Sequence, residues 1–245
     1  QEDTLALMGA ADFRFVFFGV ESPDSAVLER TRKTQNVGVS AVEAARAFNA
    51  HGMIVYGSLI LGFDGETAAT VGNMIDLVQE SGIFPTLIMP LHAFPNTQLQ
   101  VRLAREGRLF DSSRQQLASH QMFDLAATGL NFVTDRPRRQ ILEDLRRLLR
   151  TVYEPRRHAE RVIKMSAQLR PAARHRPPPR QLAARLFGFT RFALAQTFRP
   201  GGASLWGTLA KVALTHPAAL EAVASLAVIQ ASYAEQSRLY VAALE

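Results

Sequence analysis

The chain has 245 residues, of which 47% are hydrophobic and 20% are charged, a composition typical of a soluble globular protein. It contains no cysteine, which excludes disulfides, thiolate nucleophiles and cysteine-ligated metals within this chain. The net charge is +6, and arginines concentrate between Arg136 and Arg191. That pattern is typical of a solvated helix surface, or of contact with nucleic acid, anionic lipid or an acidic substrate.

Residues 1–11 predict the end of a helix and not a signal peptide, because they lack a basic start and a long apolar segment. The chain begins with Gln1, so we expect it to be part of a longer protein. The apolar window 222–234 is shorter than the ~20 residues that a membrane-spanning helix needs, so no transmembrane span is expected.

Three apolar segments are each followed by a turn-prone polar sequence and then by a helix-like stretch. They read FRFVFFGVESPD at 13–24, YGSLILGFDGET at 56–67 and TLIMPLHAFPNTQL at 86–99. This pattern predicts three β–α units of a parallel sheet, in which functional side chains lie at the carboxyl ends of the strands. We therefore expect a shared rim formed by Glu21, Ser22, Asp64, Glu66, His92 and Asn96.

The helices near these strands have recognisable end signals. Ser22 followed by Pro23 indicates an N-cap and a first-turn proline. Ser40 and Glu43 form a capping box, and apolar residues at helical spacing from Val71 predict a further helix. Other helix boundaries are expected at Gly52, Gly82, Thr97 and Gly107.

The pattern changes after residue 110. We expect the β–α units in 1–110, a helical extension packed on them in 111–170, a Pro/Arg-rich linker in 171–181 and a helical region in 182–245. Within the extension, 111–129 looks helical, Leu130–Val133 is extended, and Pro137 opens an amphipathic helix.

The motifs G-V-E-S, L-G-F-D-G-E-T and P-L-H-A-F-P-N-T, in this order and spacing, resemble strands four to six of the radical S-adenosylmethionine (SAM) core. The segments Leu28–Asn36, Leu130–Val133 and Tyr153–Arg161 are most similar to the cobalamin-binding branch of that family, the hopanoid C-2 methylase-like proteins. The resemblance implies an α/β fold, the second half of a partial (βα)6 TIM-like barrel followed by a mainly α-helical C-terminal extension.

The chain departs from the family pattern at two points. The family's reaction needs a C-x3-C-x2-C loop that holds a [4Fe-4S] cluster, whereas this chain has no cysteine. The resemblance thus implies that the cluster, and cobalamin if it is used, are bound upstream of this chain. Relatives typically read P-G-T where this chain has Pro95-Asn96-Thr97, and Asn tolerates the left-handed backbone that Gly adopts there.

The resemblance assigns SAM-binding roles to residues of the first unit. Glu21 and Ser22 would contact the ribose or methionyl end of SAM, where a carboxylate accepts hydrogen bonds. The structural alternative is that Ser22 only caps a helix beside a solvated Glu21. Lys33 would pair with the SAM carboxylate, or be a solvated helix end.

In the second unit, Gly57 and Gly62 would let the strand approach the adenine closely, or would be bulge or turn glycines. Glu66 would be part of the SAM-binding loop, and we favour a structural role in which it stabilises that loop or caps the following helix.

The substrate side would include His92 as a contact or proton shuttle, and Asn96 in the loop after the third strand. Tyr153, Arg157 and Arg161 lie at helical spacing, where they would line a substrate pocket or, as we prefer, serve packing and surface roles. The sequence offers no partner group for His92 that would support hydrolase or zinc chemistry.

We predict the C-terminal portion of a cytoplasmic radical SAM enzyme that methylates an unactivated carbon of a small molecule or lipid. Its expected partners are SAM, the upstream cluster, cobalamin and a reducing electron donor, with peripheral association at the inner membrane face and without nucleic acid. One alternative is a non-catalytic binding or scaffold protein that uses the Arg-rich helical tail. Another is a tRNA-modifying radical SAM methylthiotransferase, against which the helical extension argues. Taken alone, the chain is expected to be inactive.

Overall fold

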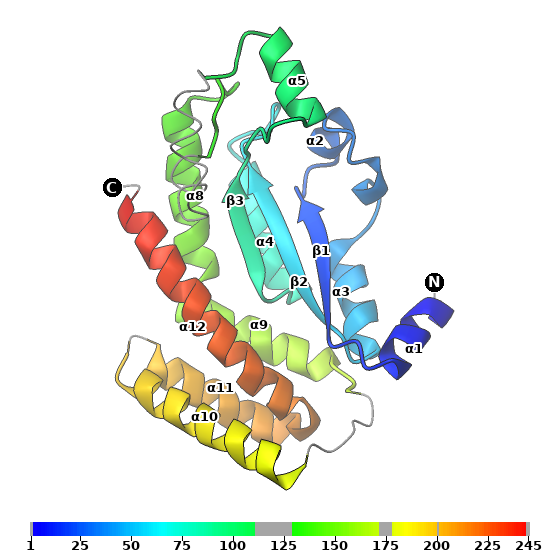
Figure 1. Cartoon of the computed structure of the whole chain (residues 1–245), viewed down its shortest axis with the longest axis vertical. Helices are drawn as coiled ribbons and strands as arrows, with labels where there is room; N and C mark the ends of the chain where they lie inside the picture. The colour runs from blue at the N-terminus through cyan, green and yellow to red at the C-terminus, as the bar shows by residue number, and fades with distance from the viewer. Residues whose placement is uncertain (1, 111–128, 172–177, 200, 244–245) are drawn as a thin grey trace.

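The computed structural model describes residues 2–110, 129–171, 178–199 and 201–243. Its elements in chain order are α1 Glu2–Ala10, β1 Phe15–Glu21, α2 Ser25–Arg30, η1 Thr34–Asn36, α3 Ala41–Ala50, β2 Ile54–Leu61, α4 Thr70–Ser81, β3 Thr86–Pro90, α5 Gln98–Arg105, α8 Arg138–Val152, α9 Pro155–Gln168, α10 Pro179–Thr197, α11 Gly202–Thr215, η2 Pro217–Ala219 and α12 Leu220–Ala243. The strands form one parallel sheet in the order β1-β2-β3 (Figure 1). The chain is an α/β protein, mostly helical, and the three predicted strands are confirmed; closure of the sheet into a partial barrel stays a prediction.

The two faces of the sheet differ in burial. Side chains of α3, α4 and α8 form a hydrophobic core with one face, where Leu59 and Leu61 of β2 are almost fully buried. The other face is more open, because Phe15 and Phe17 of β1 are 45% and 62% exposed. The aromatic ring of Tyr233, on α12, reaches this open face, and its centroid lies 6.0 Å from that of the Tyr56 ring. The carboxyl ends of the strands, where the site is predicted, therefore border an open sheet surface.

Several helix ends lie where the sequence predicts them. Ser40 accepts a hydrogen bond from Glu43 N (3.2 Å) and caps α3. Thr97 accepts one from Gln100 N (3.2 Å) and caps α5, and α4 ends at Gly82 with a left-handed φ of 68°. Local capping chemistry is thus enough to place these boundaries.

A second hydrophobic cluster joins α9, α11, η2 and α12 to the start of the sheet through Ile54 and Phe84. The predicted helix at 111–129 and most of the predicted linker at 171–181 lie outside the described residues. Within the described part of the chain, one helical stretch, 217–242, is long and apolar enough to cross a membrane by length and composition alone. The apolar window 222–234 noted in the sequence is shorter than this stretch, which extends beyond the window at both ends.

Candidate functional site

Glu21 ends β1 at the carboxyl edge of the sheet with a left-handed φ of 68°, after a bulge that begins at Gly19. Its Oε1 atom lies 3.4 Å from Lys33 Nζ, whereas Oε2 is buried without a hydrogen-bond partner in the described residues. A side-chain carbon placed on Gly19 would lie 2.8 Å from Glu21 Oε1 and 3.8 Å from Ser58 Oγ. Because Gly19 is two residues beyond Phe17, the carboxylate lies over the open face of the sheet. Glu21 therefore offers one oxygen paired with a cation and one that lacks a donor.

Ser22 is buried and does not cap the next helix. Asp24 caps α2, and its carboxylate accepts hydrogen bonds from Ala26 N (2.9 Å) and Val27 N (3.4 Å). The prediction of an N-cap at Ser22 is wrong by two residues, because Ser22 Oγ accepts from Asp24 N (3.2 Å) and closes the turn that precedes the helix. Ser22 lines a separate hollow of about 170 Å³ behind β1, so it does not converge with Glu21 on the open face.

The end of β2 is closed by Glu66, whose Oε2 accepts a hydrogen bond from Gly62 N (2.9 Å). Burial raises the pKa of Glu66 to about 7, and its Oε1 has no partner within the described ranges. A side-chain carbon at Gly62 would lie 2.4 Å from Leu130 Cδ2, and one at Gly57 would lie 2.6 Å from Ile83 Cγ2. Packing within the chain thus favours glycine at both positions. The hydrogen bond from Gly62 N shows that Glu66 stabilises the loop to which it belongs.

Asp64 joins three segments of the rim. Its carboxylate pairs with Arg102 of α5 at 2.9 Å and with Arg108 at 2.7 Å, and Arg108 Nε donates to Val133 O at 2.7 Å. Although burial raises the pKa of Asp64, hydrogen bonds and charges from Arg108 and Arg102 outweigh it and hold that pKa below its usual range. This cluster fixes the loop after β2 against the loops around α5.

His92 and Asn131 meet at the end of β3. The Asn131 side chain accepts from Ala93 N (2.8 Å) and donates to Ala93 O (3.1 Å), and its Nδ2 lies 3.4 Å from His92 Nε2. Burial lowers the pKa of His92, and its Nδ1 is buried without a partner in the described part of the chain. Asn96 has a left-handed φ of 65° and is exposed, so it lies in the turn before α5.

Tyr153 and Arg157 lie away from this rim. Tyr153 is buried and its hydroxyl donates to Thr86 O, at the opposite, amino-terminal end of β3. Its ring stacks on Tyr233 with centroids 6.2 Å apart. Arg157 is exposed, and its carbonyl accepts from Gln79 Nε2 at 3.4 Å. The structure therefore does not bring these two residues to the carboxyl ends of the strands.

No group of three or more His, Asp or Glu residues in the described ranges is arranged to hold a metal ion. The feature that fits a SAM molecule is the Glu21 carboxylate, since its unpaired oxygen can accept from an ammonium or hydroxyl group. Lys33, whose ammonium group lies 3.4 Å from that carboxylate, is the cation next to it.

A family model described as "Domain of unknown function (DUF4070)" matches residues 97–245, from α5 to the end of α12. The chain belongs to this family. The match covers α5 and the helices α8 to α12. It also includes Asn131 and Tyr153.

Two curated relatives extend the similarity. The chain is 30% identical over 160 residues to an uncharacterized methyltransferase of Synechocystis sp., covering 65% of this chain and 28% of the relative. It is 36% identical over 114 residues to the hopanoid C-2 methylase of Rhodopseudomonas palustris, covering 46% of this chain and 22% of the relative. The chain thus spans about a quarter of the length of these relatives. The predicted relationship to the C-terminal portion of cobalamin-binding radical SAM proteins is confirmed.

Sequence reasoning missed the contacts of Asn131 and the ion-pair partners of Asp64. Asn131 stands in the L-N-F-V segment, and a polar residue between apolar ones was a usable signal for a buried hydrogen-bonding role. No signal in the sequence links Asp64 to Arg108, because the two are far apart in the chain and meet only through the fold.

Proposed function

We propose that this chain forms a SAM- and substrate-binding part of a radical SAM methylase, with the SAM site at the carboxyl rim around Glu21. The observation that carries this proposal is Oε2 of Glu21 on the open face of the sheet, a buried atom with no hydrogen-bond partner among the residues that the structure describes. A buried carboxylate oxygen without a donor is costly, so a ligand ammonium or hydroxyl group would stabilise it. Membership of a methylase-like family supports the same reading.

The residues divide the work by chemistry. SAM and a reduced iron–sulfur cluster, bound with segments that complete the barrel, would supply the one-electron chemistry. Glu21 would accept hydrogen bonds from the methionyl or ribose end of SAM, and Lys33 would pair with its carboxylate. His92 and Asn131 would face the substrate at the next strand ends, and the sheet and its helices would exclude water. Cobalamin, an electron donor and an unactivated carbon of a lipid or other small molecule as methyl acceptor complete the proposal.

We expect Glu21→Gln to weaken SAM binding by the 245-residue chain by about tenfold, because it removes a charge-assisted hydrogen bond. Titration calorimetry with SAM measures this. The matched control is Glu29→Gln, an exposed carboxylate on α2, which should leave the affinity unchanged. Equal effects of the two substitutions, or cleavage of SAM by the isolated chain without an added partner, would contradict the proposal.

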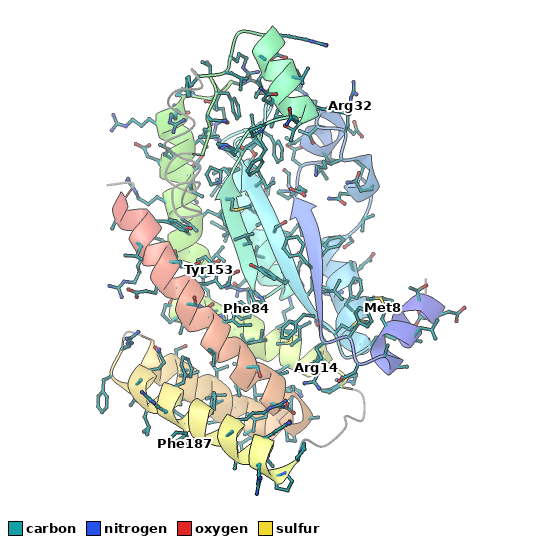
Figure 2. The ribbon with its side chains drawn as sticks, in the orientation of Figure 1. Met8, Arg14, Arg32, Phe84, Tyr153 and Phe187 are labelled. Atoms are coloured by element: carbon teal, nitrogen blue, oxygen red, sulfur yellow. The ribbon has the colours of Figure 1, made fainter. Side chains whose placement is uncertain are left out.

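We also propose that α10 associates with an anionic membrane surface. Residues 161–220 contain ten Lys or Arg and no Asp or Glu, which leaves the rest of the chain with a net charge of −4. On the outer side of α10, Phe187 is 71% exposed and Leu194 is 58% exposed, with Phe198 at 93% just beyond its end. Arg191 lies on the same stripe by helical spacing (Figure 2 shows Phe187 on α10). Exposed aromatic and aliphatic residues beside arginines are typical of helices that lie in a membrane interface.

Sedimentation with vesicles tests this association. The chain should bind vesicles that contain phosphatidylglycerol and lose most of that binding in pure phosphatidylcholine or at high salt, since each basic residue near the surface contributes about 1 kcal/mol. Replacing Phe187, Leu194 and Phe198 by Ser should reduce binding by about tenfold or more. The same replacement at Leu7, Val39 and Val133, which are exposed elsewhere, should not. Salt-dependent binding to DNA without vesicle binding would instead favour the scaffold alternative.

A further inference from the structure

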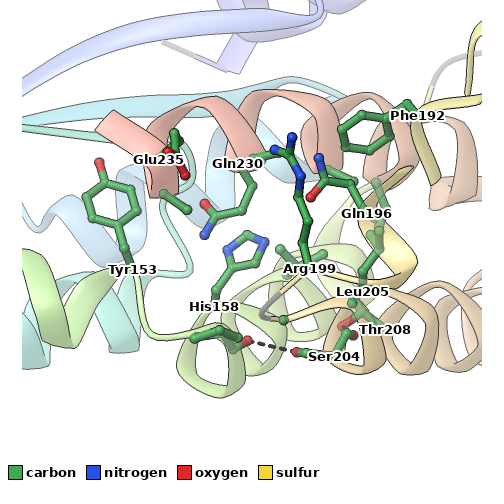
Figure 3. Close-up of a pocket in the computed structure, with 18 of the residues that line it drawn as sticks. Tyr153, His158, Phe192, Gln196, Arg199, Ser204, Leu205, Thr208, Gln230 and Glu235 are labelled. Carbon is green, nitrogen blue, oxygen red and sulfur yellow. Dashed lines mark hydrogen bonds between the residues drawn. The ribbon is translucent and has the colours of Figure 1, made fainter. Parts of the chain in front are cut away.

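A cavity of about 300 Å³ lies between α9, α10, α11 and α12 (Figure 3). Its walls are mainly apolar and include Val162, Phe192, Leu205 and Val223. Tyr153 also lines the cavity, and its hydroxyl donates a hydrogen bond to the carbonyl of Thr86, the first residue of β3. The cavity is thus at the opposite end of that strand from the rim where the SAM site is proposed. A volume of this size is at the lower end of the range for small-molecule sites. The cavity is therefore separate from the proposed SAM site.

Two buried polar atoms in this cavity lack partners among the described residues, His158 Nδ1 of α9 and Gln230 Oε1 of α12. The His158 ring packs on Phe84 with centroids 4.3 Å apart. Burial, and secondarily the charge of Arg161, lowers the pKa of His158 to about 3, so the ring is neutral at pH 7 and offers one donor and one acceptor. Buried polar atoms without partners are rare in folded proteins, so both indicate a missing ligand group.

Arg199, an exposed residue just beyond the end of α10, supplies a positive charge at the border of the cavity. Of the other charged lining residues, Glu235 and Arg238 pair with each other at 3.1 Å. Arg199 has no ion pair within the part of the chain that the structure describes. Figure 3 shows the His158 ring and the Gln230 amide directed toward the same part of the cavity, the end of the Arg199 side chain beside Gln196, and Glu235 near Tyr153. Glu235 is five residues from Gln230 on α12, about 7.5 Å along the helix axis, so its carboxylate is not next to the Gln230 amide.

We infer that the cavity binds an amphipathic hydroxy acid, a molecule with an apolar chain, one hydroxyl and one carboxylate. The apolar chain lies against the aliphatic walls. The hydroxyl donates to Gln230 Oε1 and accepts from His158, in the tautomer that carries its hydrogen on Nδ1. The carboxylate pairs with Arg199. Each unpaired group of the cavity then has a partner of complementary chemistry.

Calorimetric titration of the 245-residue chain with four probes tests this inference. The reference probe is 3-hydroxydecanoate. Decanoate lacks the hydroxyl, 1-decanol lacks the charge and 3-hydroxybutyrate lacks most of the apolar chain. We expect 3-hydroxydecanoate to bind at least about threefold more tightly than decanoate and at least about tenfold more tightly than the other two. Chemical-shift changes of the His158 ring should follow the same order and locate the binding.

Two variants separate the contributions. Arg199→Gln should weaken 3-hydroxydecanoate by about tenfold and leave 1-decanol unchanged, because it removes only the ion pair. Gln230→Leu should bring 3-hydroxydecanoate down to the affinity of decanoate without changing decanoate itself. Arg147→Gln, an exposed arginine of α8 that does not line the cavity, is the control and should have no effect. Equal binding of all four probes, no binding of any, or an equal loss with Arg147→Gln would overturn the inference.

Discussion

Replacing Arg161 by Ala should lower the free energy of unfolding by about 2–4 kcal/mol. Arg161 is 1% exposed on α9, and its guanidinium donates to Gln79 Oε1 of α4 at 3.2 Å and to Val152 O at the end of α8. Burial lowers the pKa of Arg161 to about 10, so it remains charged at pH 7. The side chain thus joins three helices, and its loss removes the donor to a buried helix-end carbonyl and to a partly buried amide oxygen.

Urea unfolding at pH 7 measures this change, with Arg157→Ala as the matched control. Arg157 is one turn earlier on α9 and exposed, so its replacement should change stability by no more than about 0.5 kcal/mol. Arg161→Met keeps much of the buried chain without the cost of burying a charge, so it should destabilise less than Ala. If Arg161→Ala stayed within about 0.5 kcal/mol of the unsubstituted chain, the three-helix contact would contribute nothing.

The strands and most helix ends could be predicted because their signals are local. An apolar run followed by a turn defines β2, and the hydroxyl of Ser40 caps α3 through a contact within three residues. The same local reasoning failed at Ser22, where two candidate caps stand two residues apart and Asp24 reaches the helix amides. Choosing between neighbouring caps depends on backbone geometry that the sequence pattern does not contain.

The candidate site was predictable in its place but not in its contacts. Parallel strands put Glu21, Glu66 and His92 at one edge of the sheet, as expected from the order of the β–α units. Whether Arg157 or Arg161 would be buried could not be predicted, since both occupy similar positions one turn apart. The difference arises because the Arg161 guanidinium reaches Gln79 of α4 and Val152 O at the end of α8, whereas Arg157 contacts Gln79 through its backbone carbonyl. Such contacts between distant segments exist only in the folded chain.

Gly62→Ala should destabilise the chain by about 3–5 kcal/mol, and two independent costs add to that value. The backbone has a φ of 112°, which is unfavourable for a residue with a side chain. The new methyl carbon would also lie 2.4 Å from Cδ2 of Leu130, which is fully buried and cannot move away easily. Urea unfolding measures the total.

Gly72 within α4 and Gly82 just after it separate those costs. Gly82 has a φ of 68°, but a side-chain carbon placed on it would lie no closer than 3.7 Å to its neighbours. Gly82→Ala should therefore cost only about 1 kcal/mol of stability. Gly72→Ala is helical with nothing within 4 Å and should stabilise by about 0.5–1 kcal/mol. SAM affinity, measured on the same variants, decides what Gly62 is for. If Gly62→Ala lowers stability, packing against Leu130 explains why glycine is needed at position 62. If the variant is fully stable but no longer binds SAM, then the ligand, and not the core, leaves no room for a side chain there.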